Sequence, residues 1–231
     1  MSGIILRGNR KMIKMIVCSF YNTLIDEEDA IPTSTMLELD RIKQKEIKLT
    51  ILTNRLLEDV LYYNQDYPFI DYVIALNGSI LYDVKENQKK LYDSFTKEEL
   101  LEIQKKYEKK EIIYYTENAS WTELPEDKVY KVEVKGIKKN IVSQYHTSIF
   151  QRNKEFFLEI TKNSYSSTIQ DLKEENLLGI IGNESEKELL EEKYKIYVVR
   201  NAPKGLKEKT SFLTKSNLQK GVEFVIKKEI K

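Results

Sequence analysis

Short apolar runs that end in polar turns alternate with segments of helical periodicity near both ends of the chain. The first such runs, at residues 12–18, 49–52 and 72–76, are rich in β-branched residues, as in strands buried on both faces of a parallel sheet. Helical patterns follow at about 33–42 and 56–63. Later strands are predicted at 177–181 and 194–199, with helices at 167–174, 185–192 and 218–228. This rhythm predicts an α/β fold with a doubly wound, Rossmann-like parallel sheet.

The pattern changes in the middle of the chain. Thr96 and Glu99 form a capping-box sequence that opens a helix predicted to end near residue 109. Strand patterns follow at 111–116 and 128–134, a short helix is predicted at 136–145, and a hairpin turns at 152–154. We therefore predict a core domain built from residues 1–82 and 163–231, with a small α+β cap domain, residues 83–162, inserted into it.

Charge and cysteine content exclude several classes of protein. The 38 basic and 37 acidic residues nearly cancel, so no excess charge favours nucleic acid or an acidic membrane. The single cysteine, Cys18, excludes a disulfide scaffold and favours a reducing compartment. No apolar run is long enough to span a membrane, and the first 14 residues lack the apolar stretch of a signal peptide. A cytoplasmic location is expected.

Polar residues follow three of the predicted parallel strands. Ser19, Thr53 and Asn77 each stand at the carboxyl end of one strand. In open α/β sheets the ligand crevice lies outside these ends. The three side chains therefore mark the candidate site.

The segment 15–25 resembles the first motif of haloacid dehalogenase-like (HAD) phosphatases, in which a strand ends in Asp-x-Asp-Gly-Thr-Leu. Ser19 and Tyr21 stand at the two aspartate positions, Asn22 at the glycine and Thr23 at the threonine. The inserted middle block resembles the cap of the Cof-type subfamily, which follows the third core strand. The resemblance extends from about residue 12 to 228.

The resemblance implies a reaction that this chain lacks the groups to perform. In the family the first aspartate attacks phosphorus, the second acts as acid and base, and Mg²⁺ is held by carboxylates and a backbone carbonyl. Ser19 needs a general base before it can attack, and the Tyr21 phenol is a poor base near neutral pH. Cys18 alternates to the other face of the strand and is interpreted as a core residue.

Groups that hold phosphate in the family survive in part. Thr53 and Arg55 match the Thr-Gly-Arg motif, and Asn77-Gly78 matches the Asn-Gly signature, although that pair is equally typical of a turn. Ser167 falls at the position of the family lysine. The resemblance therefore implies a reduced phosphate site made of Thr23, Thr53, Arg55, Asn77, Gly78 and Ser167.

The metal motif Gly-Asp-x-x-Asn-Asp is represented by residues 182–187. Asn183 replaces the aspartate that binds the metal in the family, while Glu184 and Glu186 remain as carboxylates. They could hold Mg²⁺ in a rearranged site, or they could be acids that a helix N-terminus favours. We expect that Mg²⁺, implied by the family, is not bound.

Because nucleophile, acid/base, cationic and metal positions are all substituted together, we predict a phosphatase fold without phosphatase activity. Such a protein could bind a phosphorylated small molecule or a protein partner. The alternative is an active Mg²⁺-dependent hydrolase of small phosphoesters, of the sugar phosphate type, with a rearranged site.

Overall fold

The computed structural model describes residues 12–231 except 26–27, 67, 139–143 and 153. Its larger sheet has seven strands, of which the first five pair in parallel. In sheet order they are β12 (Lys195–Val198), β11 (Leu177–Ile181), β1 (Met15–Ser19), β2 (Lys48–Leu52), β3 (Tyr72–Ala75), β4 (Ile80–Asp83) and β5 (Gln88–Leu91). The predicted parallel α/β core is confirmed.

Helices flank this sheet and complete one large apolar core. They are α1 (Thr33–Gln44), α2 (Leu57–Asp66), α4 (Tyr165–Gln170), α5 (Lys204–Lys209), α6 (Gly221–Glu229) and the 3-10 helix η3 (Glu184–Glu191). All five residues of β1 and of β11 are buried, as expected for central strands covered on both faces. Each buried Leu, Ile or Val side chain contributes roughly 1.5–3 kcal/mol of hydrophobic stabilisation.

A second, antiparallel sheet of five strands has its own apolar cluster. Its strands are β7 (Ser120–Trp121), β6 (Ile112–Tyr115), β8 (Lys131–Lys135), β10 (Glu155–Thr161) and β9 (His146–Arg152), and it carries helix α3 (Lys97–Lys106). The Thr96–Glu99 capping box at the start of α3 is present, as predicted. We call this sheet and α3 the cap.

The structure differs from the sequence-based boundaries in several places. The hairpin β4–β5 belongs to the core sheet, which therefore continues to residue 91, beyond the predicted boundary at 82. All four residues of β5 are exposed and none is β-branched, so no buried pattern marks it as a strand. Helix α4 begins at Tyr165, two residues before its predicted start, and η3 is a 3-10 rather than an α-helix. Of the short helix predicted at 136–145, residues 139–143 lie outside the described residues, and residues 136–138 and 144–145 on either side are not helical.

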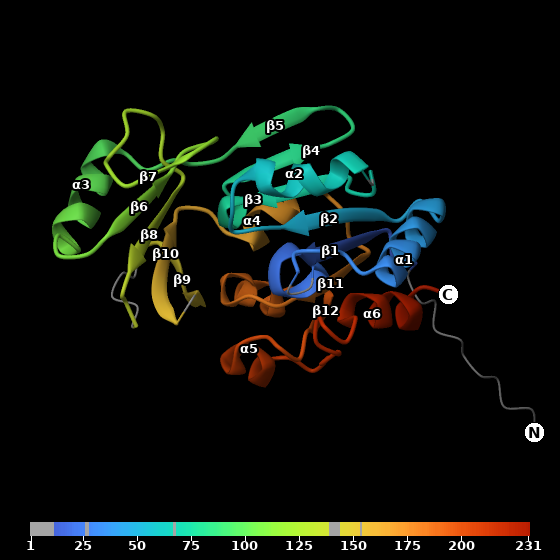
Figure 1. The fold of residues 1–231 in the computed structure, drawn as a ribbon. Helices are drawn as coiled ribbons and strands as arrows, with labels where there is room; N and C mark the ends of the chain where they lie inside the picture. The colour runs from blue at the N-terminus through green and yellow to red at the C-terminus, as the bar shows by residue number, and fades with distance from the viewer. Residues whose placement is uncertain (1–11, 26–27, 67, 139–143, 153) are drawn as a thin grey trace, which may run out of the picture.

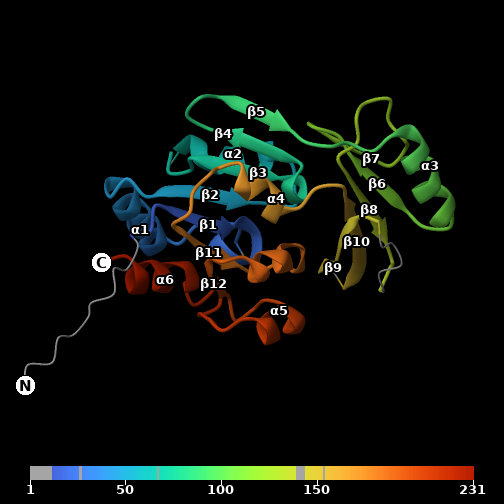
Figure 2. The same ribbon diagram turned by 180° about the vertical axis from the view of Figure 1, so that it is seen from behind.

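The parallel strands direct their carboxyl ends toward the cap. Figures 1 and 2 show the cap beside that edge of the core sheet and the C-terminus at the opposite end of the core. The turn Phe20–Leu24, the turn after β3 and the start of η3 therefore all face the cap. None of the helices in the described part of the chain combines the length and apolarity needed to cross a membrane.

The turn after β3 depends on left-handed backbone geometry. Leu76, Asn77 and Gly78 have φ angles of 47°, 57° and 101°. A Cβ on Gly78 would collide with the carbonyl oxygen of Ser164, which precedes α4. Gly78 is thus required both by its own φ and by the close approach of the chain that returns from the cap.

We predict that Gly78→Ala lowers the free energy of unfolding by about 2–4 kcal/mol, since strain and a backbone collision act together. Gly205→Ala is the matched control, because that glycine lies in α5 with no neighbouring atom within 4 Å of an added Cβ. The control should be neutral or stabilising by up to about 1 kcal/mol. Urea unfolding of both variants tests this; equal stabilities would contradict it.

Candidate functional site

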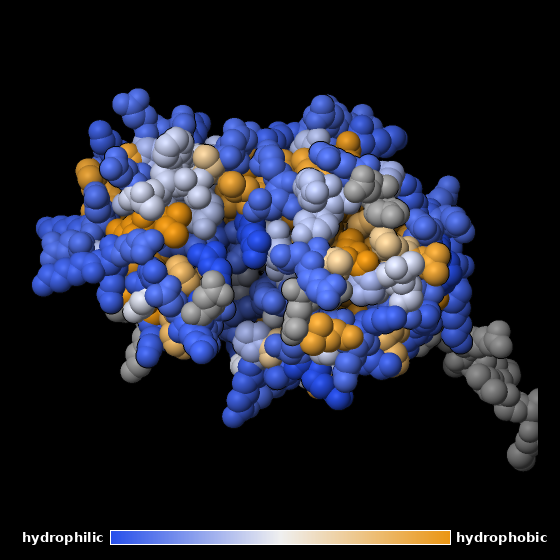
Figure 3. All heavy atoms as spheres, in the orientation of Figure 1, coloured by the Kyte–Doolittle hydropathy of each residue, from blue (hydrophilic) through white to orange (hydrophobic). Residues whose placement is uncertain are grey.

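A polar crevice of about 850 Å³ separates the core from the cap. Figure 3 shows it as a hollow with mainly hydrophilic residues around it. The core side includes Tyr21, Asn22, Arg55, Asn183 and Glu184. The cap side includes Tyr115, Glu133, Phe150, Arg152, Phe156 and Glu159. The crevice lies at the carboxyl ends of the parallel strands, where the sequence placed the candidate site.

The residue at the nucleophile position does not reach this crevice. Ser19 has no exposed surface, and its Oγ accepts a hydrogen bond from the backbone N–H of Gly182 at 3.2 Å. Its hydroxyl is also hydrogen-bonded to the buried Glu186. Cys18 is buried as expected, and burial raises the pKa of its thiol. Neither Ser19 nor Cys18 is therefore placed to attack a molecule in the crevice.

Asn183 and Glu186 form the centre of a buried hydrogen-bond network. One carboxylate oxygen of Glu186 accepts from the backbone N–H groups of Gly182 at 3.0 Å and Asn183 at 2.9 Å. The amide nitrogen of Asn183 donates to the other oxygen at 3.0 Å and to the carbonyl oxygen of Tyr21 at 3.2 Å. Because both partners are acceptors, the orientation of the Asn183 amide is fixed: its nitrogen must face them.

Burial raises the pKa of Glu186, and the hydrogen bonds from Asn183, Ser19 and Gly182 only partly oppose this effect. By linkage, a carboxyl whose pKa is raised in the folded state binds protons more tightly there than in the unfolded chain. Its contribution to stability therefore falls as the pH rises above about 4.5, the value for the free side chain.

This donor set does not fit Mg²⁺. A magnesium ion needs several oxygen lone pairs directed at one point. Here the Asn183 amide already donates its N–H groups to the Tyr21 carbonyl and to Glu186, and so lies between the two oxygens. Glu184 lines the crevice, but among the described residues no group of three or more acidic, histidine or cysteine side chains is arranged to hold a metal. As arranged here, these side chains do not form a magnesium site.

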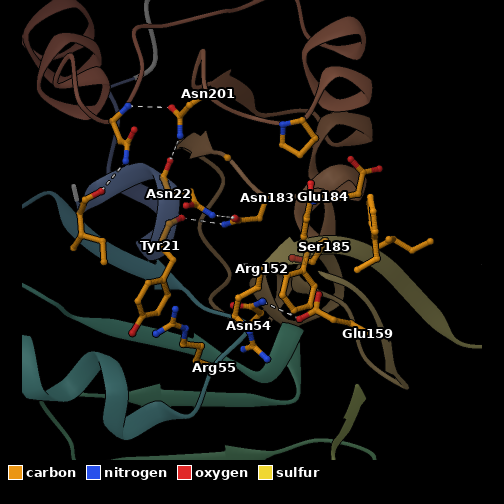
Figure 4. Close-up of a pocket in the computed structure, with 18 of the residues that line it drawn as sticks. Tyr21, Asn22, Asn54, Arg55, Arg152, Glu159, Asn183, Glu184, Ser185 and Asn201 are labelled. Atoms are coloured by element: carbon orange, nitrogen blue, oxygen red, sulfur yellow. Dashed lines mark hydrogen bonds between the residues drawn. The ribbon is translucent and has the colours of Figure 1, made fainter. Parts of the chain in front are cut away.

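Asparagine amides continue this network across the crevice floor. Asn22 donates to the Oδ1 of Asn183 at 3.1 Å, and its own carbonyl oxygen accepts from Asn201 at 2.8 Å. The Oδ1 of Asn201 accepts from the backbone N–H of Asn217 at 3.0 Å. Figure 4 shows Asn22, Asn183 and Asn201 in this arrangement. Asn22 has a φ of 61°, a left-handed conformation that asparagine tolerates better than most residues.

Tyr21 is held by an aromatic and cationic contact. The guanidinium of Arg55 lies 3.6 Å from the centre of the Tyr21 ring, and Phe20 packs edge-on at 5.1 Å. Burial raises the pKa of the Tyr21 phenol, and Arg55 only partly counteracts this. The phenol is thus largely protonated at neutral pH and cannot serve as a general base there. Figure 4 shows both side chains at the crevice wall.

The residues predicted to hold phosphate do not converge in the crevice. Of the six, only Arg55 lines it. Thr53 is buried and accepts from the backbone N–H of Arg55 at 3.1 Å, and the buried Oγ1 of Thr23 packs against Gly182. Ser167 donates to the carbonyl of Ser164 at 2.8 Å within the start of α4. Asn77 and Gly78 form the left-handed turn after β3.

A buried ionic cluster joins the cap to the core and was not found from the sequence. It consists of Lys131, Glu133 and Glu159, whose side chains are only 1–2% exposed. The ammonium of Lys131 lies 2.6 Å from Glu133 and 2.9 Å from Glu159. The sequence 131–135, Lys-Val-Glu-Val-Lys, alternates as if its charged face met water, so no local signal indicated that both faces are covered.

Glu159 links this cluster to the core. Its oxygens accept from Asn54 at 2.8 Å and Asn77 at 3.1 Å, both at the ends of core strands, and from Ser148 at 2.5 Å. Burial by itself raises the pKa of Glu159, but Lys131 and these donors outweigh burial and hold the pKa below its usual value. The lysine also donates to the backbone carbonyl of Asn54 at 2.5 Å. The cap is therefore joined to two turns of the core through this cluster.

Comparison with known proteins assigns the chain to a family. Residues 16–191 match the profile of the haloacid dehalogenase-like hydrolases, so the chain belongs to this family. The fold is similar to that of a haloacid dehalogenase-like hydrolase from B. subtilis, with a TM-score of 0.78, 14% identity, and coverage of 93% of this chain and 99% of the other.

Two further solved structures share the fold. A HAD subclass IIB sugar phosphatase has a TM-score of 0.75, with 15% identity over 93% of this chain and 98% of that one. A phosphatase of the same superfamily from Bacteroides thetaiotaomicron has a TM-score of 0.76, with 15% identity over 99% and 98%. Among curated protein sequences none matches. The resemblance to the HAD family inferred from the sequence is thus confirmed, and the fold is shared with a subclass IIB member.

We predict that Glu159→Gln lowers the free energy of unfolding by about 3–5 kcal/mol at neutral pH. The change removes one of the two negative charges that balance the Lys131 ammonium, and it places an NH₂ group against hydrogen-bond donors. The pKa of Glu159 is depressed in the folded state, so its contribution is complete above about pH 4.5 and is lost as the pH falls through the folded value. The cost should therefore shrink in acid. Urea unfolding between about pH 3 and 7 measures it.

Glu155→Gln is the control on the same strand. Glu155 is exposed and pairs with Lys135 at 3.0 Å, so its removal should cost less than about 1 kcal/mol. If Glu155→Gln lost as much stability as Glu159→Gln, or if the loss in Glu159→Gln did not change with pH, the cluster would not stabilise the junction.

We further predict that Asn183→Asp destabilises the protein by about 2–4 kcal/mol at pH 7. The change removes two donated hydrogen bonds and places a second carboxylate beside the buried Glu186. Because like charges raise the pKa values of both acids, the loss should diminish below about pH 5. Thermal melts at several pH values test this. Asn118→Asp, at an exposed cap residue, is the control and should cost under about 1 kcal/mol; an equal effect there would show that the loss does not come from Glu186.

Proposed function

We propose that this chain is a HAD-family protein that has lost phosphatase activity and uses the crevice between core and cap to bind a small polar molecule. The observation that carries the proposal is the amide of Asn183. It donates to the Tyr21 carbonyl and to Glu186, and so fills the coordination positions that a catalytic metal would need. The loss of a nucleophile alone lowers turnover on the order of 10⁶-fold in a well-studied serine hydrolase.

The burial of Ser19 supports the same proposal. A serine hydroxyl that is fully buried and hydrogen-bonded to Gly182 and Glu186 has no access to the crevice. The alternative, an active Mg²⁺-dependent hydrolase with Glu184 or Glu186 as ligands, has less support. Glu186 accepts from the backbone N–H groups of the η3 turn, and in the described part of the chain Glu184 belongs to no group of three or more acidic, histidine or cysteine side chains that could hold a metal.

The crevice itself favours ligand binding. Its polar floor consists of amide groups held by one another, so it is preorganised and loses little entropy when it receives hydroxyl or amine groups. A phosphorylated ligand, which the family resemblance suggested, has the support of Arg55 but not of the other five predicted residues.

A phosphatase screen tests the proposal. With Mg²⁺ and a panel of phosphoesters, the wild-type protein should show no release of phosphate above the enzyme-free rate. Turnover that Ser19→Ala abolishes would contradict the loss of activity, as would turnover that Glu184→Gln abolishes. Glu155→Gln, at an exposed cap residue, is the matched control: it should behave as wild type, so a loss confined to the other two variants would assign the turnover to the crevice.

A repaired protein gives the complementary result. The combined variant Ser19→Asp, Tyr21→Asp, Ser167→Lys and Asn183→Asp should gain a melting temperature that rises with Mg²⁺, because carboxylates replace the Asn183 amide. The wild type should show no such rise. A folded quadruple variant that remains insensitive to Mg²⁺ would show that the backbone of the site, not only its side chains, has departed from the family.

A further inference from the structure

The cap side of the crevice contains a carboxylate oxygen with an unsatisfied hydrogen-bonding capacity. Glu133 is 2% exposed, and its Oε1 lies 2.6 Å from the ammonium of Lys131. The Tyr115 hydroxyl also interacts with the Glu133 carboxylate, but its Oε2 is buried and, among the described residues, receives no hydrogen bond. A buried acceptor without a donor is costly, about 1–3 kcal/mol, so its persistence calls for a function.

Arg152 shows what kind of group this oxygen attracts. Its guanidinium lies 3.6 Å from the Oε2 of Glu133, beyond hydrogen-bond distance, and its side chain is 42% exposed. The same guanidinium lies 4.5 Å from the ring centre of Phe157 and 5.8 Å from that of Phe150. Arg152 thus lies loosely at the rim of a cation-binding arrangement of one carboxylate and two aromatic rings. We call this arrangement the seat.

The charges of the whole crevice favour a cation over an anion. Four acidic residues and two arginines line it: Asp29, Glu133, Glu159, Glu184, Arg55 and Arg152. One of the arginines, Arg55, is stacked on Tyr21. The Lys131 ammonium behind the wall is shared by Glu133 and Glu159, so it does not neutralise both. A dianionic phosphate would meet an excess of negative charge here.

From this geometry we propose that the cap half of the crevice binds a small molecule bearing an ammonium or guanidinium group, with the Oε2 of Glu133 as the acceptor and the cap aromatics as the wall. Arg152 is an internal competitor that the ligand displaces or pushes aside. This inference rests on the proposed function, because it names the chemical class of ligand for the same crevice.

Calorimetric titration of the protein tests the inference, with agmatine and putrescine as probes and inorganic phosphate as the anionic counterpart. Wild-type protein should bind at least one cationic probe saturably. Glu133→Gln should weaken binding at least about tenfold, because the seat loses the charge that holds the cation. Arg152→Ala should tighten binding several-fold, because the competing guanidinium is gone. Comparison of agmatine with putrescine shows which cation the seat prefers.

Glu111→Gln is the matched control: this cap acid is half exposed, pairs with Lys135 at 3.4 Å and lies outside the crevice, so binding should not change. The opposite responses of Glu133→Gln and Arg152→Ala separate the seat from a general loss of folding. No saturable binding by either wild type or Arg152→Ala would overturn the inference. So would phosphate binding that Arg152→Ala abolishes. Neither result depends on the phosphoester screen, where turnover would instead overturn the proposed loss of activity.

Discussion

The side-chain amide of Asn183 is the interaction on which the rest of the site depends. It donates to the Tyr21 carbonyl and to Glu186 and thereby joins the turn after β1 to the turn after β11. Buried carbonyl and carboxylate oxygens at this point must be matched by a cation or by donors. The chain meets that requirement with neutral N–H groups, so the loops keep their relative position without a metal. The other substitutions are consistent with this solution, because Ser19 and Glu186 are then satisfied by neighbours rather than by a ligand.

The cap is fixed by a different means. Glu159 accepts from Asn54 and Asn77, and Lys131 binds the carbonyl of Asn54, so both partners on the core side belong to turns that close parallel strands. A buried cluster of two acids and one lysine is stable only while each member keeps its partners. The cluster therefore couples the cap to two turns of the core.

The fold was predictable from the sequence, whereas the site was predictable only in outline. Apolar strands at 15–19, 48–52 and 177–181 are buried along nearly their whole length and leave a local pattern. The exposed strand β5 leaves none, because it is held by its pairing with β4 rather than by burial of its own side chains. Ser19, Tyr21 and Asn183 were placed correctly at strand ends. The roles of Thr53, Asn77 and Ser167 depend on the folded arrangement around them, and so does the burial of Lys131, Glu133 and Glu159.

These two sets of contacts give the crevice opposite dependences on protonation. Glu186 has a raised pKa, so the core side becomes less stable as the pH rises above about 4.5, whereas the depressed pKa of Glu159 makes the cap junction less stable as the pH falls below that value. At neutral pH the contribution of Glu159 to the stability of the cap junction is complete, whereas Glu186 on the core side bears a free-energy cost for its buried charge. A ligand that adds a cation on the cap side would satisfy the Oε2 of Glu133 without disturbing the asparagine floor.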